Sequence, residues 1–110
     1  MEVKDLKGLE AFRKEKMSKV NLFETERFFC DIYCLLPGQS QRPHSHAGSD
    51  KVYVVLRGKV EASVGGESSA LGEGEAVLAP AGEPHGIENR SGAEAVCLVF
   101  MAPHPDHNRP

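Results

Sequence analysis

The chain has 110 residues, of which 40% are hydrophobic and 26% charged, and its formal net charge is −3 at pH 7. This length is typical of one domain with a modest core and is short of the size that favours two cores. The acidic balance argues against a nucleic-acid partner, because nucleic-acid binding normally requires a clustered basic excess. The sequence contains no run of eighteen apolar residues, the length that a membrane-spanning helix needs.

The first segment, residues 1–18, is predicted to be a short helical or irregular arm. Leu6, Leu9 and Phe12 recur three residues apart, and Asp5 precedes them as a candidate N-cap. The N-terminus mixes acidic and basic residues where a signal peptide needs an apolar centre, so the expected location is the cytoplasm.

A cationic run lies at the end of this arm and is interrupted by Glu15; its members are Arg13, Lys14, Lys16 and Lys19. Alternating or interrupted charge of this kind is typical of a solvated surface. Contact with an acidic partner is the alternative interpretation.

From residue 19 to residue 102 the sequence consists of short strand-like runs separated by turn residues. The predicted strands are Lys19–Glu24, Arg27–Leu36, Val52–Leu56, Lys59–Val64, Glu75–Ala79 and Ala95–Met101. Gly65-Gly66 predicts a tight hairpin turn, while Pro80 and Pro84 exclude regular central strand at that point. Many short strands at regular spacing predict an all-β sandwich or barrel.

The run Val52–Leu56 is continuously apolar, which indicates a strand buried on both faces. If Lys51 faces the interior, Tyr53 and Val55 do so too, and Val52, Val54 and Leu56 lie on the outer face. A second copy of the chain would cover that face, so we predict a homodimer. Coverage by the N-terminal arm is the alternative.

Two other groups of residues carry less information. The three cysteines, Cys30, Cys34 and Cys97, form an odd set without a Cys-x-x-Cys pair, so they are expected to be core thiols rather than a disulfide framework. The tail, residues 103–110, is expected to be loose, with His104 and His107 exposed.

The most informative residues are His44, His46 and His85. Neutral imidazole is the commonest metal ligand in proteins, and residues two apart in an extended strand point the same way. Three protein ligands with further positions left open are typical of a catalytic metal site, whereas structural zinc usually takes four, mostly cysteines. The three histidines are therefore predicted to hold one divalent ion.

The spacing around these histidines resembles the two motifs of the cupin superfamily. The first motif is a Gly, five residues, His-x-His, then a Glu and a Gly; the second is a Gly, five residues, Pro-x-Gly, two residues, His, three residues and Asn. The matching positions are Gly38, His44, His46 and Gly58, and then Gly74, Pro80, Gly82, His85 and Asn89. The resemblance implies a single-domain all-β fold, a double-stranded β-helix or jelly-roll barrel over residues 19–102, and a tendency to form dimers.

One position departs from the family pattern: the expected Glu ligand is replaced by Lys51. A lysine cation beside a divalent ion would repel it unless burial lowers the pKa of the amine or the side chain turns away. Asp50 is the nearby carboxylate, but in a strand it faces away from Lys51. A three-histidine site is therefore the preferred prediction, with an ion whose identity among iron, zinc, nickel and manganese stays open.

Two classes of function follow. In the first, the protein is a metalloenzyme of dioxygenase, isomerase or decarboxylase type that acts on a small organic acid or carbonyl substrate. Lys51 would then hold an anionic group of the substrate, and the Tyr53 phenol would contact a metal-bound ligand. In the second, the same cavity binds or senses a small molecule without converting it. The fold by itself does not choose between them.

Overall fold

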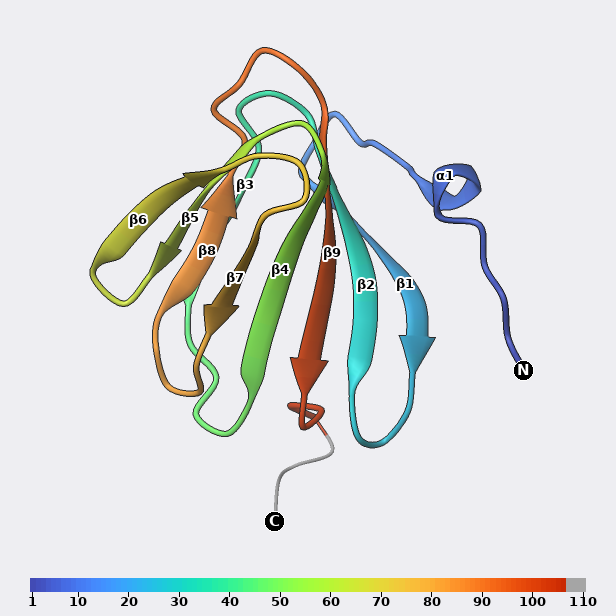
Figure 1. Ribbon diagram of the computed structural model, residues 1–110, viewed down its shortest axis with the longest axis vertical. Coiled ribbons are helices and arrows are strands. Elements are labelled where there is room, and N and C mark those ends of the chain that lie inside the picture. Colours follow the sequence, from blue (N-terminus) through green and yellow to red (C-terminus); the bar gives the residue numbers. More distant parts are fainter. Residues whose placement is uncertain (107–110) are drawn as a thin grey trace.

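The structure is a computed structural model that describes residues 1–106, so the prediction for His107 lies outside the described residues. Within these residues, one short helix precedes nine strands (Figure 1). The elements are α1 (Leu6–Leu9), β1 (Ser18–Glu24), β2 (Phe29–Leu35), β3 (Ser40–His44), β4 (Asp50–Arg57), β5 (Val60–Val64), β6 (Glu67–Leu71), β7 (Ala76–Ala79), β8 (His85–Glu88) and β9 (Ala95–Ala102). No helix of the described chain is long and apolar enough to cross a membrane.

The strands form two facing antiparallel sheets. The five-stranded sheet has the order β1-β2-β9-β4-β7, and the four-stranded sheet has the order β3-β8-β5-β6. The two sheets lie side by side in Figure 1, with the N-terminal arm outside the five-stranded sheet. The predicted all-β fold of the cupin type is confirmed.

All six predicted runs are strands, with ends shifted by at most a few residues. The predicted runs did not include β3, β6 or β8, although the prediction that His44 and His46 point the same way assumed an extended strand at β3. These strands belong to the smaller sheet, and β6 exposes four of its five residues while β3 contains Pro43, so neither shows the apolar alternation that reveals a half-buried strand. The predicted hairpin is present, since Gly65 and Gly66 connect the paired residues Val64 and Glu67.

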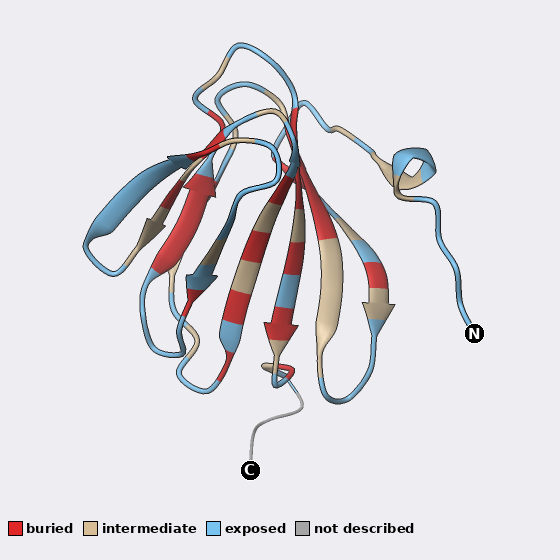
Figure 2. Cartoon of the chain, viewed as in Figure 1, coloured by how far each residue is buried: buried red, intermediate tan, exposed pale blue. Residues whose placement is uncertain are grey.

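The apolar core has two parts, one between the sheets and one outside the larger sheet. Figure 2 shows the alternation of buried and half-buried residues along β4. The inner part includes Tyr33, Tyr53 and Val55. The outer part is centred on β1, β2 and β9, where three arm residues pack against it: Leu6, Leu9 and Phe12. Asp5 caps α1 as predicted, because its carboxylate accepts a hydrogen bond from the Lys7 amide at 3.2 Å.

Strand β4 orients its side chains as predicted. Lys51, Tyr53 and Val55 are buried between the sheets, whereas Val52 and Val54 are half-buried on the outer face. The arm packs over β1, β2 and β9, which confirms part of the alternative prediction. The region around β4 and β7 keeps Leu56 and Leu78 exposed, at 39% and 55%, and the homodimer stays a prediction.

The prediction that His104 is exposed is wrong. Its side chain is 3% exposed, its backbone amide donates to the Arg27 carbonyl at 2.9 Å, and its ring contacts Glu24 and Phe29. Ser49 also donates to the Pro103 carbonyl at 2.7 Å. These contacts fix the start of the C-terminal segment against β1 and β2, a long-range pairing that the local sequence does not indicate.

Candidate metal centre

The hydrogen-bond register of the smaller sheet brings two of the three histidines together. His44 ends β3, His85 begins β8, and the two residues are direct partners in the antiparallel pair. His46 was expected on the same strand as His44, but it lies in the loop beyond the strand end. Its position is set by the loop that precedes β8, because the Gly82 amide donates to the His46 carbonyl at 2.8 Å.

The three imidazoles lie close enough to share one ion. The candidate ligand atoms of His44, His46 and His85 are all within 4.8 Å of one another. The ring centroids are separated by 4.9 Å, 4.6 Å and 5.9 Å. A metal–nitrogen bond is about 2.0–2.1 Å, so the most widely separated of these nitrogens would move closer together on binding one ion.

Hydrogen bonds to the backbone select which ring nitrogens remain free. The Nδ1 atoms of His44 and His85 lie 3.0 Å from the carbonyls of Arg42 and Glu83, respectively. Carbonyls accept only, so both Nδ1 atoms carry the proton and both Nε2 atoms keep a lone pair. His85 Nε2 is the one buried side-chain nitrogen or oxygen of the described residues that has no hydrogen-bond partner. An unsatisfied buried lone pair facing two other imidazoles fits a metal ion.

The surroundings of His46 and His85 favour the neutral imidazole, which is the form that binds metal. Burial lowers the pKa of His85, and the positive charge of Lys51 lowers it further. Burial also lowers the pKa of His46, and the charges of His44 and Lys51 act in the same direction.

Lys51 lies in a polar cluster beside these histidines. Its ammonium nitrogen is 3.3 Å from Gln41 Oε1 and lies 5.2 Å and 5.1 Å from the ring centroids of Tyr33 and Tyr53. The Tyr53 hydroxyl donates to the same Gln41 oxygen at 2.6 Å, and the Tyr53 ring is 6.2 Å from that of His85. Burial lowers the pKa of Lys51 to about 7, and the charge of Lys19 contributes to this shift.

The two nearby aspartates have different positions. Asp50 is exposed and its carboxylate accepts a hydrogen bond from the Ala81 amide at 2.9 Å, so it fixes the loop before His85 and lies outside the histidine cluster. Asp31 was not predicted as a site residue. It is half-buried two residues before Tyr33, on the inner face of β2; burial raises its pKa, while its hydrogen bond from Asn21 at 2.8 Å acts in the opposite direction. The sequence does contain a signal for Asp31, because it is the charged residue in an otherwise apolar run of β2.

Asn89, the last position of the second motif, has a structural role. Its side-chain amide donates to the carbonyls of Leu35 and Ala93 at 3.0 Å and 2.8 Å, and its Oδ1 accepts from Ser91. The side chain is fully buried and holds the turn after β8 rather than facing the histidines.

Gly86 allows the two histidine-bearing strands to approach each other. A Cβ at this position would lie 2.5 Å from the Gln41 carbonyl oxygen and 2.9 Å from the Pro43 nitrogen, both backbone atoms. Gly86→Ala is expected to lower the free energy of unfolding by about 1–3 kcal/mol through overpacking and to weaken metal binding, because β3 must shift away from His85. Urea unfolding and metal titration measure both effects.

The matched control is Gly92→Ala, because a Cβ at Gly92 meets nothing within 4 Å. We expect this variant to be within about 0.5 kcal/mol of the wild type. If the two variants have equal free energies of unfolding and equal metal affinities, the close approach of β3 and β8 at Gly86 contributes to neither property.

Comparison with known proteins gives consistent matches. The family model described as cupin domain matches residues 31–101. The crystal structure of TT1209 from Thermus thermophilus is 51% identical, with a TM-score of 0.93 over 96% of this chain and 100% of that chain. The tetracenomycin polyketide synthase protein TcmJ of Streptomyces glaucescens is 37% identical over 66% of this chain and 50% of its own length. Beta-D-galactosidase Rv1717 of Mycobacterium tuberculosis is 36% identical over 74% of this chain and 68% of its own length.

Proposed function

This chain belongs to the cupin family, and from that premise we propose that it is a metal-dependent enzyme acting on a small organic acid or carbonyl compound. The observation that carries the proposal is the buried, unpartnered Nε2 of His85, which faces the rings of His44 and His46. A divalent ion held there would supply Lewis-acid or oxygen-activating chemistry. Three neutral ligands would leave the ion its full charge, which favours an anionic substrate.

The residues around the histidines support this choice of substrate. Lys51 would bind a carboxylate or an enolate-like oxygen when protonated, and its pKa of about 7 would let it exchange a proton near neutral pH. The Tyr53 hydroxyl would hold the substrate or a metal-bound ligand in place of its present bond to Gln41. The walls formed by Tyr33 and Tyr53 would exclude water from the reacting atoms.

The named relatives differ in how well their names fit this site. The name of TcmJ connects that protein with polyketide synthesis, and polyketides are rich in carbonyl groups, which agrees with the proposed substrate class. The name of Rv1717 gives a β-galactosidase. Glycoside hydrolysis ordinarily uses two carboxylates, whereas the cluster found among the described residues consists of three histidines.

The test uses metal-free protein reloaded separately with Fe²⁺, Zn²⁺, Ni²⁺ and Mn²⁺. Each form is given a panel of keto acids and diketones while oxygen uptake, carbon dioxide release and solvent deuterium exchange beside the carbonyl are recorded. We expect conversion with at least one metal and none in the metal-free protein. A compound that raises the melting temperature and is recovered unchanged with every metal would favour the second candidate, a binding or sensing module.

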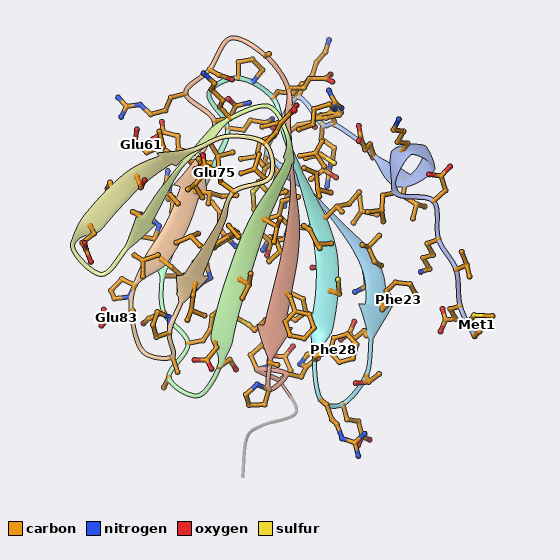
Figure 3. The ribbon with its side chains drawn as sticks, in the orientation of Figure 1. Met1, Phe23, Phe28, Glu61, Glu75 and Glu83 are labelled. Carbon is orange, nitrogen blue, oxygen red and sulfur yellow. The ribbon has the colours of Figure 1, made fainter. Side chains whose placement is uncertain are left out.

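We also propose that the protein is a homodimer through the outer face of β4, β7 and β9. The exposed fractions there are 39% for Leu56, 55% for Leu78 and 40% for Phe100, next to the half-buried Val52 and Val54. Phe100 stacks on Phe28, which extends the apolar surface toward the β1–β2 loop; Phe28 is labelled in Figure 3. Contiguous apolar surface of this kind marks an interaction site.

Leu78→Glu is expected to convert the dimer into a monomer, because a carboxylate would be buried without a partner at the interface. Size-exclusion chromatography with light scattering at about 10 μM measures the change. The control is Val3→Glu, since Val3 is 84% exposed on the arm away from this face. A wild-type protein that is monomeric at this concentration would contradict the proposal.

A further inference from the structure

A pocket away from the histidines lies where the open edges of the two sheets meet the chain that precedes β1. It has a volume of about 360 Å³ and is lined by Arg13, Lys16, Met17, Lys19 and Ser40. Strand β1 is the edge of the larger sheet and β3 is the edge of the smaller one, so neither edge is covered there by a further strand. Lys19 belongs to β1, and Ser40 opens β3.

The charge of this pocket is its most unusual property. Three of the five lining residues are cations, although the whole chain carries a net charge of −3. In the described part of the chain, Arg13, Lys16 and Lys19 form no ion pair. Cations gathered around a concave surface reinforce one another's potential, so the pocket attracts anions. All four cations of the run that ends the arm are exposed, as predicted, and three of them line this pocket.

The backbone that carries these cations is held in place. The Gln39 side-chain amide donates to the Arg13 carbonyl at 2.6 Å, while its oxygen accepts from the Leu36 amide at 2.8 Å. Met17 is buried in the inner core, which anchors the chain between Lys16 and Lys19. The Lys19 ammonium lies 5.4 Å from the ring centroid of Tyr33, and this contact turns it toward the space between the sheets.

The pocket is distinct from the candidate metal centre. Ser40 and His44 stand at opposite ends of β3, and four residues of strand span about 13 Å. None of the three histidines lines the pocket. The two sites share an electrostatic connection, because the charge of Lys19 lowers the pKa of Lys51 and of His46, so the test below locates the ligand directly.

We propose that this pocket is a binding site for a small polyanion, a molecule bearing at least two carboxylate or phosphate groups. Two or more negative charges would compensate the three cations, and the Arg13 guanidinium fork matches the oxygens of either group. The Ser40 hydroxyl adds a neutral donor on the opposite wall. The volume lies at the lower end of the range typical of small-ligand sites, which fits a compact ligand rather than a large one.

The test titrates metal-free protein with pyrophosphate and, in a second arm, with citrate, with acetate as the monoanion control. Calorimetry gives the dissociation constants, and amide chemical shifts locate the ligand. We expect saturable binding of at least one polyanion, with shifts at residues 13–19 and at Ser40. The arm that binds more tightly identifies phosphate or carboxylate as the preferred group.

Variants of this surface provide the matched comparison. Lys16→Gln and Lys19→Gln are each expected to weaken binding about threefold to fivefold, as for other partly exposed ion pairs, and Arg13→Gln combined with both about 30-fold or more. The control is Lys14→Gln, which removes the same charge from the same segment but outside the pocket lining. All four positions are exposed, so the variants are expected to keep the wild-type melting temperature.

Three results would overturn the proposal. The first is the absence of saturable binding of either polyanion up to millimolar concentration. The second is a loss of affinity in Lys14→Gln as large as that in Lys16→Gln, which would mean general attraction to a charged surface. The third is a set of shifts centred on His44–His46, which would place the anion at the other site.

Discussion

His85→Ala is expected to remove metal binding from this protein. The imidazole of His85 is almost completely buried, its Nδ1 is held by the Glu83 carbonyl, and its Nε2 has no other partner. Loss of a residue that merely orients a metal ligand typically weakens metal affinity 10- to 100-fold, so loss of the ligand itself should weaken it by more than about 100-fold. Calorimetric titration of metal-free protein with Zn²⁺ and elemental analysis after dialysis measure the effect.

The control for this experiment is Asp50→Asn. Asp50 lies next to Lys51 and accepts a hydrogen bond from Ala81, and an asparagine oxygen can accept the same bond. We expect the affinity of this variant to stay within about threefold of the wild type. If His85→Ala keeps wild-type affinity, the three histidines do not share an ion, and the proposed function fails with them.

Lys51→Met is expected to stabilise the metal-free protein, and the gain should depend on pH. The side chain is 1% exposed and burial lowers its pKa from 10.5 to about 7. Below pH 7 the amine is charged in both states, and the penalty of burying that charge is complete, on the order of 5 kcal/mol. Loss of the bond to Gln41 offsets about 1 kcal/mol, so we expect a gain of about 4 kcal/mol at pH 6.

The gain should shrink as the pH rises from 7 toward 10.5. In this range the folded protein releases the Lys51 proton while the unfolded chain keeps it, so the wild type becomes more stable with increasing pH. At pH 9 the difference between the two proteins should be about 3 kcal/mol smaller than at pH 6. Urea unfolding of both proteins at several pH values measures this difference.

The difference in free energy of unfolding between Lys51→Met and the wild type removes the effects of buried groups that both proteins share. Burial raises the pKa of Tyr33 and Tyr53, and raises that of Cys97 to about 12, which lowers the stability of both proteins in alkaline solution. The control is Lys59→Met, an exposed lysine that precedes β5; we expect the difference between this variant and the wild type to stay constant over the same pH range. A difference between Lys51→Met and the wild type that is constant from pH 6 to pH 9 would contradict the burial of a titrating amine.

The three histidines of the cluster could be predicted from the sequence, but the segments that hold them in position could not. The motif spacing identified His44, His46 and His85, and the structure brings them together. The reason given for the first pair was only partly right, because β3 ends at His44 and His46 is held by the Gly82 amide from a distant loop. Strand alternation is a local rule, and it does not describe a loop whose path is set by a second segment.

The amino-acid sequence by itself determined the all-β class, six of the nine strands, the placement of Lys51, Tyr53 and Val55 on one face of their strand, and the identity of the three histidines. These depend on residue type and on spacing along one segment. Only the tertiary structure decided that Asp50 binds a loop, that Asp31 and Gln41 lie near Lys51, and that three cations surround a pocket. Each of these depends on which distant strands become neighbours, and that follows from packing two sheets together rather than from any local pattern.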